Sequence, residues 1–222
     1  MRLISVNVGR EEPIQGAKSS GKTGIFKRPV LTPVEVTAGG LAGDAISDTE
    51  NHGGADQAVY LFGKPDYEWW SEELGYELSP GAFGENLTIS DLESAEAYIG
   101  DRFSIGSVVL EVTAPRIPCV TLAVRMGDPA FARRFRRAER PGLYCRVIRA
   151  GGVRVGDRVG PEPYRGERVP VLEVFRTFFE PDPGEAILRR HLAAPIAVRA
   201  REMNERQLAR VLERDPKARS II

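Results

Sequence analysis

A cysteine that follows two prolines and precedes a helical pattern is the residue of this sequence best placed for chemistry. The segment PRIPC at 115–119 holds the backbone rigid and puts Arg116 close to the thiol of Cys119. A neighbouring arginine and the N-terminus of a helix, expected over 120–125, both favour a thiolate. A thiolate can bind a soft metal ion or act as a nucleophile. Cysteine is more commonly buried and inert, and Cys145, inside an apolar strand pattern, fits that description.

The segment 48–57 contains one of the two histidines of the chain. His52 precedes Gly53 and Gly54, which allow a ligand to come close to the backbone, and Asp56 and Gln57 follow. His52 can donate a proton, bind a metal ion or make a structural hydrogen bond, and the sequence leaves these roles open.

The segment GKTGIFKRPV at 21–30 is suited to an anion. Lys22, Lys27 and Arg28 lie close to two glycines, so cations and backbone N–H groups can both face a phosphate. The spacing of a P-loop is absent. An ordinary polar loop beside a strand explains the same composition equally well.

The segment GAFGENLT at 81–88 is a glycine turn that delivers Glu85 and Asn86 into a strand. Their side chains are equally able to bond to the turn itself. A further polar segment contains five arginines, which we interpret as a solvated helix face rather than a nucleic-acid surface because no aromatic residues are interleaved with them. These arginines are Arg133, Arg134, Arg136, Arg137 and Arg140.

Composition excludes several classes of protein. The 222 residues carry 31 basic and 31 acidic side chains, so no overall field holds the chain on polymeric nucleic acid or on an anionic membrane. Two cysteines form no disulfide scaffold, and with two histidines they match no zinc spacing. The first residues resemble a strand rather than a signal peptide, and no apolar run is long enough to span a membrane. We therefore expect a cytoplasmic protein.

Short strands separated by turns must position these segments. The 23 glycines and 16 prolines mark frequent turns, and the β-branched runs between them are typical of a β-barrel or sandwich. The expected strands are 2–8, 34–37, 58–62, 86–89, 107–113, 144–149 and 152–159. The fold class is therefore mainly β, with a few peripheral helices.

Helices are expected at four further places. Pro65 near its first turn and Gly75 at its end delimit a helix over 64–74, and a second helix begins at 128 and runs toward 137. Beyond about residue 164 the chain becomes helical, with a helix over 186–192 and an amphipathic one that includes 208–212. We predict a β domain over 1–164 and a small all-α unit over 165–222.

Taken together, the motifs resemble MOSC-domain proteins of the YiiM type, named after the C-terminal domain of molybdenum cofactor sulfurase. The resemblance covers residues 1–164, and the tail resembles the three-helix domain that follows in this subfamily. The motifs that carry it are GKTGIFKRPV, GLAGDAISDTENHGGADQAVYLF, PGAFGENLTISDL, IGDRFSIGSVVLEVTAPRIPC and GVRVGD.

The resemblance implies a β-barrel that binds the molybdenum cofactor and a reductase that detoxifies N-hydroxylated compounds such as 6-hydroxylaminopurine. Cys119 matches the cysteine expected to bind molybdenum, and we expect His52, or else Asp56 or Glu85, to supply a proton. Electrons would come from a separate reductase, since no NAD or flavin motif is visible. Residues of the motif segments that we expect to contact the cofactor are Lys22, Thr23, Lys27, Arg28, Gly53, Gly54, Asp56, Gln57, Glu85, Asn86 and Arg116.

Three other functions are alternatives to this one. A sulfur-transfer protein would hold a persulfide on Cys119, and a hydrolase would pair Cys119 with His52, although no oxyanion-hole signature is present. A binding module would use the helical tail, which can dock a reductase, mediate self-association or cover an end of the barrel.

Overall fold

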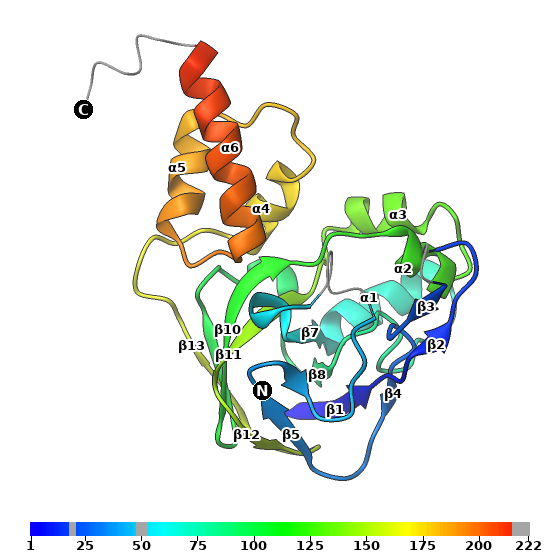
Figure 1. Cartoon of the computed structure of the whole chain (residues 1–222). Coiled ribbons are helices and arrows are strands. Elements are labelled where there is room, and N and C mark those ends of the chain that lie inside the picture. The colour runs from blue at the N-terminus through cyan, green and yellow to red at the C-terminus, as the bar shows by residue number, and fades with distance from the viewer. Residues whose placement is uncertain (18–20, 48–52, 215–222) are drawn as a thin grey trace.

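The computed structural model describes residues 1–17, 21–47 and 53–214, and it forms a sheet-dominated body with helices on its surface (Figure 1). The strands are β1 (Leu3–Val8), β2 (Glu12–Pro13), β3 (Lys22–Thr23), β4 (Arg28–Pro29), β5 (Val34–Thr37), β6 (Gly40–Leu41), β7 (Val59–Gly63), β8 (Leu87–Ile89), β9 (Arg102–Ile105), β10 (Val108–Pro115), β11 (Leu143–Arg149), β12 (Gly151–Val153) and β13 (Val159–Glu162). The α-helices are α1 (Lys64–Leu74), α2 (Val120–Arg125), α3 (Phe131–Ala138), α4 (Val171–Thr177), α5 (Glu185–Ala193) and α6 (Val198–Arg214), and the 3-10 helices are η1 (Ala55–Gln57) and η2 (Ser94–Glu96).

The main sheet in the described part of the chain has eight strands in the order β13-β9-β10-β11-β7-β8-β1-β4. Its neighbours are antiparallel except for β7 and β8, which run parallel because α1 connects one to the next in a crossover. A three-stranded sheet, β12-β5-β6, and the hairpin β2-β3 lie beside it. The prediction of a mainly β fold is therefore confirmed.

Closure into a barrel is not shown by this strand order, which runs from β13 at one end to β4 at the other. An isolated bridge between Arg2 and Arg158 joins the chain before β1 to the chain before β13. The barrel therefore stays a prediction, whereas the β-rich body is established.

Most expected strands are present within a residue or two, but the one expected over 152–159 is wrong. The chain leaves β12 after Val153, turns, and re-enters the sheet as β13 at Val159. Asp157 closes the turn by accepting the N–H of Arg154 at 2.9 Å, and Gly156 adopts φ 93°. A GD pair inside an apolar run therefore marks a turn between two strands.

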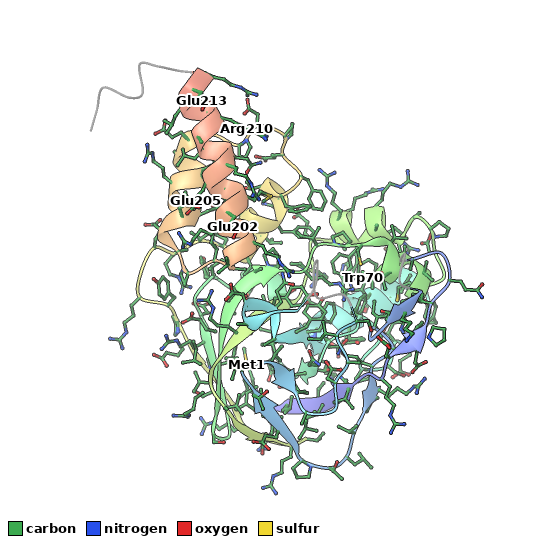
Figure 2. The ribbon with its side chains drawn as sticks, viewed as in Figure 1. Met1, Trp70, Glu202, Glu205, Arg210 and Glu213 are labelled. Carbon is green, nitrogen blue, oxygen red and sulfur yellow. The ribbon has the colours of Figure 1, made fainter. Side chains whose placement is uncertain are left out.

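Two adjoining cores support the body. One is aliphatic and lies between the main sheet and the small sheet. The other is aromatic and packs α1, α2 and α3 against β7, with the rings of Phe62 and Phe83 stacked at 4.4 Å. Trp70 lies in this second core, between Phe83 and the α3 residues Phe131 and Phe135 (Figure 2).

The three helices expected near the C-terminus are present as α4, α5 and α6, and they pack at one end of the sheet (Figure 1). Val169, Val171, Ala194 and Ile196 belong to the same aliphatic core as the strands. The predicted boundary at 164/165 stays a prediction, but this unit buries its apolar residues against the body. No helix within the described ranges combines the length and apolar character that a membrane span requires.

At the junction of β7 and α1, Gly63 is required because no side chain fits there, and not because the backbone adopts a conformation that favours glycine. Its φ is −97°, which any residue adopts, but an added Cβ would lie 1.6 Å from the carbonyl oxygen of Leu92. We expect Gly63→Ala to lower the free energy of unfolding by about 3 kcal/mol, because backbone must move. Gly152→Ala, where nothing lies within 4 Å, should change it by less than about 0.5 kcal/mol. Urea unfolding measures both, and equal effects would contradict this explanation.

Candidate functional site

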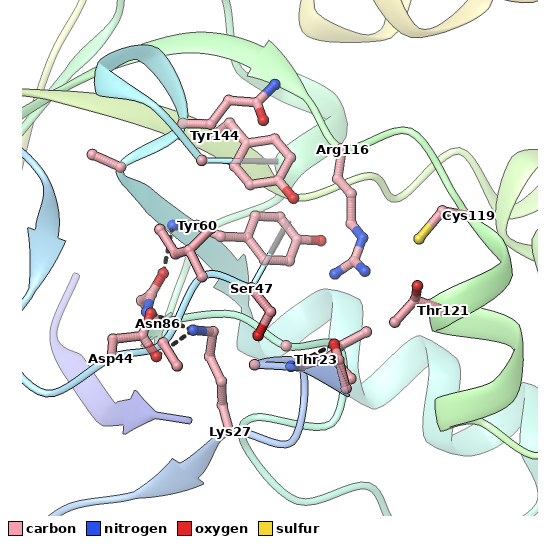
Figure 3. A pocket seen from close by; sticks show the side chains of 18 residues that line it. Thr23, Lys27, Asp44, Ser47, Tyr60, Asn86, Arg116, Cys119, Thr121 and Tyr144 are labelled. Atoms are coloured by element: carbon pink, nitrogen blue, oxygen red, sulfur yellow. Dashed lines mark hydrogen bonds and ion pairs between the residues drawn. The ribbon is translucent and has the colours of Figure 1, made fainter. Parts of the chain in front are cut away.

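A pocket open to solvent lies where β7, β11 and the segment 23–27 approach the start of α2 (Figure 3). It has a volume of about 90 Å³. Several segments far apart in sequence form its wall. The lining residues are Thr23, Gly24, Ile25, Lys27, Asp44, Ala45, Ile46, Ser47, Gly53, Gln57, Ala58, Tyr60, Gly84, Asn86, Arg116, Cys119, Thr121 and Tyr144.

Cys119 enters the pocket because β10 ends at Pro115 and α2 begins at Val120. The intervening loop, with Pro118 in it, leaves Cys119 in an extended conformation (φ −131°, ψ 169°) just before the helix. Its thiol is partly exposed, whereas Cys145 is fully buried in β11. Burial, followed by the charge of Glu111, raises the pKa of Cys145, which keeps that thiol protonated. Within the described structure, the two cysteines therefore have different environments.

Arg116 is a buried cation directed into the pocket (Figure 3). The side chain is 4% exposed, its guanidinium lies 5.2 Å from the ring centroid of Tyr60, and it donates to the carbonyl oxygen of Phe83. Burial disfavours its charge, but the groups of Tyr144, Tyr60 and Cys119 outweigh burial and raise the pKa of Arg116. Arg116 therefore stays charged beside Cys119.

A second buried cation, Lys27, is paired at the opposite side of the pocket. Its ammonium group contacts the carboxylate of Asp44, and the two side chains are 8% and 4% exposed. Burial lowers the pKa of Lys27, and the charge of Asp44 opposes that shift. The same carboxylate accepts the N–H of Gly9 at 2.8 Å and an amide hydrogen of Asn86 at 2.8 Å. Asn86 in turn accepts the N–H of Tyr60 at 3.0 Å, so these bonds join the N-terminal segment to β7 and the start of β8.

Glu85, next to Asn86, points away from the pocket lining and organises the glycine turn. One carboxylate oxygen accepts the N–H of Gly81 at 2.6 Å, the hydroxyl of Tyr67 at 2.7 Å and the hydroxyl of Thr88 at 2.8 Å. Burial raises the pKa of Glu85. Its surroundings favour the second interpretation given above, in which the side chain bonds to its own turn.

The structure brings seven of the expected site residues to the pocket and leaves others outside. Those at the pocket are Thr23, Lys27, Gly53, Gln57, Asn86, Arg116 and Cys119. Lys22 and Arg28 are exposed and pair with Glu11 and Glu12, respectively. Gly54 is exposed and does not line the pocket. His52 lies outside the described residues, so its role stays a prediction.

Asp56 also lies off the pocket, although Gln57, beside it, lines the pocket. Its carboxylate accepts the N–H of Val198 at 2.7 Å, at the first residue of α6, and lies 3.0 Å from Nε of Arg146. Arg146 in turn donates to the carbonyl oxygen of Pro195 at 3.1 Å. Asp56 therefore ties the C-terminal helices to the chain beside the pocket, and its expected contact with the cofactor stays a prediction.

Other pocket residues were not expected from the sequence. Tyr60 and Tyr144 lie with ring centroids 4.9 Å apart, and burial raises the pKa of each, so both hydroxyls keep their protons. Asp44, Ser47 and Thr121 also line the pocket. The tyrosines occupy inward positions of strands, and Asp44 is the acid of the GLAGD motif, which was quoted only for the family resemblance.

A cluster of three or more histidine, cysteine or acidic side chains that could hold a metal ion is absent from the part of the chain that the structure describes. The donor set of the pocket consists of one thiol, two cations, amides, hydroxyls and the carboxylate of Asp44, which is paired with Lys27. Such a set suits a metal that arrives with ligands of its own.

Comparison with known proteins assigns the chain to a protein family. The MOSC domain description matches residues 48–160. Protein YflK of Bacillus subtilis is 36% identical over 154 residues, 69% of this chain and 70% of that protein. YiiM of Escherichia coli is 30% identical over 63% of this chain and 64% of that protein. A protein named Reductase from Gibberella moniliformis is 33% identical over 71% of this chain but only 28% of its own length. The crystal structure of YiiM from Geobacillus stearothermophilus has a TM-score of 0.77 at 23% identity, covering 93% of this chain and 98% of that one.

Asp44→Asn tests the buried ion pair. The amide removes the charge that offsets the Lys27 ammonium group, so we expect the free energy of unfolding to fall by about 3 kcal/mol. Glu68→Gln, which breaks the exposed pair with Lys64 at 3.0 Å, should change it by less than about 0.5 kcal/mol. Chemical denaturation compares the two, and a stable Asp44→Asn protein would show that the pair does not hold the pocket together.

Asp56→Ala tests the link between α6 and the pocket wall. Loss of the acceptor for Val198 should lower the free energy of unfolding by about 1–2 kcal/mol. Hydrogen exchange should accelerate at the amides of Val198 and of residues 55–58. Glu205→Ala removes an exposed acid of α6 and serves as the control (Figure 2). Unchanged exchange at the pocket wall in Asp56→Ala would refute the link.

Proposed function

Because this chain belongs to the family of MOSC-domain proteins, we propose that it is a molybdenum-cofactor-dependent reductase of N-hydroxylated compounds. The observation that carries the proposal is the buried Arg116 guanidinium beside the partly exposed thiol of Cys119 in one pocket. A relative of 33% identity is named a reductase, and one of 30% identity is a YiiM protein.

The pocket residues fit a metal–pterin cofactor with an anionic group. Arg116 Nε and Gln57 Oε1 are buried, and neither atom has a hydrogen-bond partner within the described structure. Buried polar atoms of this kind are normally satisfied, so a bound group is a reasonable partner for them. The volume of about 90 Å³ is below the range typical of cofactor pockets, roughly 300–1,000 Å³. The pocket therefore suits the reactive end of a larger group.

The charges of the pocket residues also favour a cofactor with an anionic group. Asp44 neutralises Lys27, whereas within the described residues no carboxylate pairs with Arg116. One buried positive charge is thus left for a thiolate or for a ligand oxygen. Cys119 Sγ would bind the metal, and Arg116 would hold an anionic group.

Reduction of an N-hydroxyl group to an amine takes up two electrons and two protons and releases water. The molybdenum cofactor, when bound, would supply the two-electron chemistry. Tyr60 and Tyr144 offer aromatic faces to a planar compound. Asp56 and Glu85 are engaged elsewhere. Among the residues that the structure describes at the pocket, Lys27 is therefore our candidate proton donor, in addition to His52, which the sequence predicts for this role.

The electrons would come from a separate reductase, because the chain contains no NAD or flavin motif. We propose a cytoplasmic location, as expected from the sequence. A sulfur-carrier function is a second candidate, since the contact of Arg116 with Cys119 would stabilise a persulfide as well as a metal thiolate.

Cys119→Ser tests the function. In a host that makes the cofactor, we expect the wild-type protein to hold close to one molybdenum per chain and the variant to hold at least about tenfold less, because a ligand is lost. Activity toward 6-hydroxylaminopurine, with reduced methyl viologen as electron donor, should fall with the metal. Cys145→Ala, which changes the buried thiol, should retain both. Elemental analysis and the activity assay give the two values.

Two outcomes would contradict the proposal. One is an active wild-type protein that contains neither molybdenum nor pterin. The other is a mass spectrum in which Cys119 of the untreated protein carries one extra sulfur atom and no molybdenum is bound, which would favour the sulfur carrier.

A further inference from the structure

The arginines of α3 and of the residues directly after it divide into two sets with different surroundings. Arg140 pairs with the buried Asp66 at 2.8 Å, and Arg134 pairs with Glu73 at 3.2 Å. Arg133, Arg136 and Arg137 are exposed, and the described residues place no carboxylate within ion-pair distance of them. The first set holds this segment to the body through ion pairs, and the second set makes no ion pair with the described residues.

The three exposed arginines lie on one side of α3. Their spacing is i, i+3 and i+4, which brings like charges together and destabilises the helix. Phe131 and Phe135, also four residues apart, occupy the buried side. In a chain with equal numbers of acidic and basic residues, an uncompensated stripe of this kind indicates a surface that meets negative charge.

Exposed apolar side chains lie on the adjacent helix α2 and next to the aromatic partner of Arg136. Val120, directly after Cys119, is 58% exposed, and Val124 lies one turn further along α2 and is also exposed. On the other side, Arg136 lies 4.2 Å from the ring centroid of Phe179, and the adjacent Phe178 is 45% exposed. Arginine and aromatic residues around an apolar patch are enriched in protein interfaces.

This surface lies beside the pocket. Cys119 immediately precedes α2, and α2 packs against α3 (Figure 1). Packed helices have axes about 8–10 Å apart, so a protein seated on α3 would come close to the Cys119 end of the pocket. An electron donor needs this proximity to the pocket, whereas binding of a nucleic acid does not require it.

We propose that α2 and α3 form a docking face for an acidic electron-transfer protein, with Arg133, Arg136 and Arg137 as its charged contacts and Val120, Val124 and Phe178 as its apolar ones. The inference rests on the proposed reductase function. It differs from docking on the C-terminal helices, whose exposed residues on α6 include acids as well as arginines (Figure 2).

A flavodoxin, a small acidic protein that carries FMN, is the probe. We expect the full-length protein to bind it at 50 mM NaCl and about tenfold more weakly at 300 mM, because salt screens the charges. The variant R133E/R136E/R137E should bind at least about tenfold more weakly at low salt and lose the salt dependence. R133Q/R136Q/R137Q removes the repulsion within α3 and should fold well while it also binds weakly. Calorimetric titration measures binding independently of catalysis.

A matched control carries the same change in charge at another place. R165E/R206E/R210E alters exposed arginines of the C-terminal segment and should bind flavodoxin as the wild type does. With reduced methyl viologen all these proteins should be equally active, whereas flavodoxin-driven activity should fall only in the α3 variants. If the wild type shows no activity with reduced methyl viologen, this result would count against the reductase function. The binding measurement would then decide the docking face by itself.

Three results would overturn the docking face. The first is that the wild type does not bind flavodoxin, and the second is that the α3 variants bind it as tightly as the wild type. The third is that only the C-terminal control variant loses binding. Binding of a single-stranded oligonucleotide that depends on the three arginines, without binding of flavodoxin, would assign the surface to nucleic acid instead.

Discussion

The burial of one ion pair, Lys27 with Asp44, is the constraint on which the pocket depends. A buried ammonium group without its partner would be strongly destabilising, so the segments that carry the two charges must stay together. The carboxylate also binds the backbone of Gly9 and the amide of Asn86, and Asn86 binds the backbone of Tyr60. Five distant positions are thereby held at one side of the cavity. Cys119 and Arg116 approach from the end of β10, and the space between the two groups is the candidate site.

Charge is distributed unevenly in this neutral chain, and each positive group has a distinct environment. Lys27 is neutralised within the pocket, whereas Arg116 is stabilised by a ring, a carbonyl oxygen and the thiol of Cys119. Asp56 and Arg146 use their charges to attach the C-terminal helices beside the pocket wall. Charged residues therefore have separate roles in the pocket, in the attachment of the C-terminal helices and in the arginine stripe of α3, although the positive and negative charges of the whole chain are equal in number.

Local features of the fold were predictable because they depend on neighbours in sequence. Pro65 and Gly75 delimit α1, and alternating apolar residues mark β1 and β5 within a residue of their observed bounds. The helix after Cys119 was predicted over the residues that form α2. The single strand over 152–159 failed because Gly156 and Asp157 make a turn that divides it into β12 and β13. Closure of the sheet depends on pairing between strands at its two ends, which no local pattern encodes.

The sequence by itself determined which segments contain chemistry: the cysteine motif, the lysine segment, the histidine segment and the glycine turn. Only the tertiary structure decided which member of each adjacent pair faces the pocket. Lys27 is buried there and Arg28 is exposed, and Thr23 lines the pocket while Lys22 is exposed. The physical reason is that successive side chains of extended backbone point to opposite sides, so composition leaves the choice open until strand register and packing settle it.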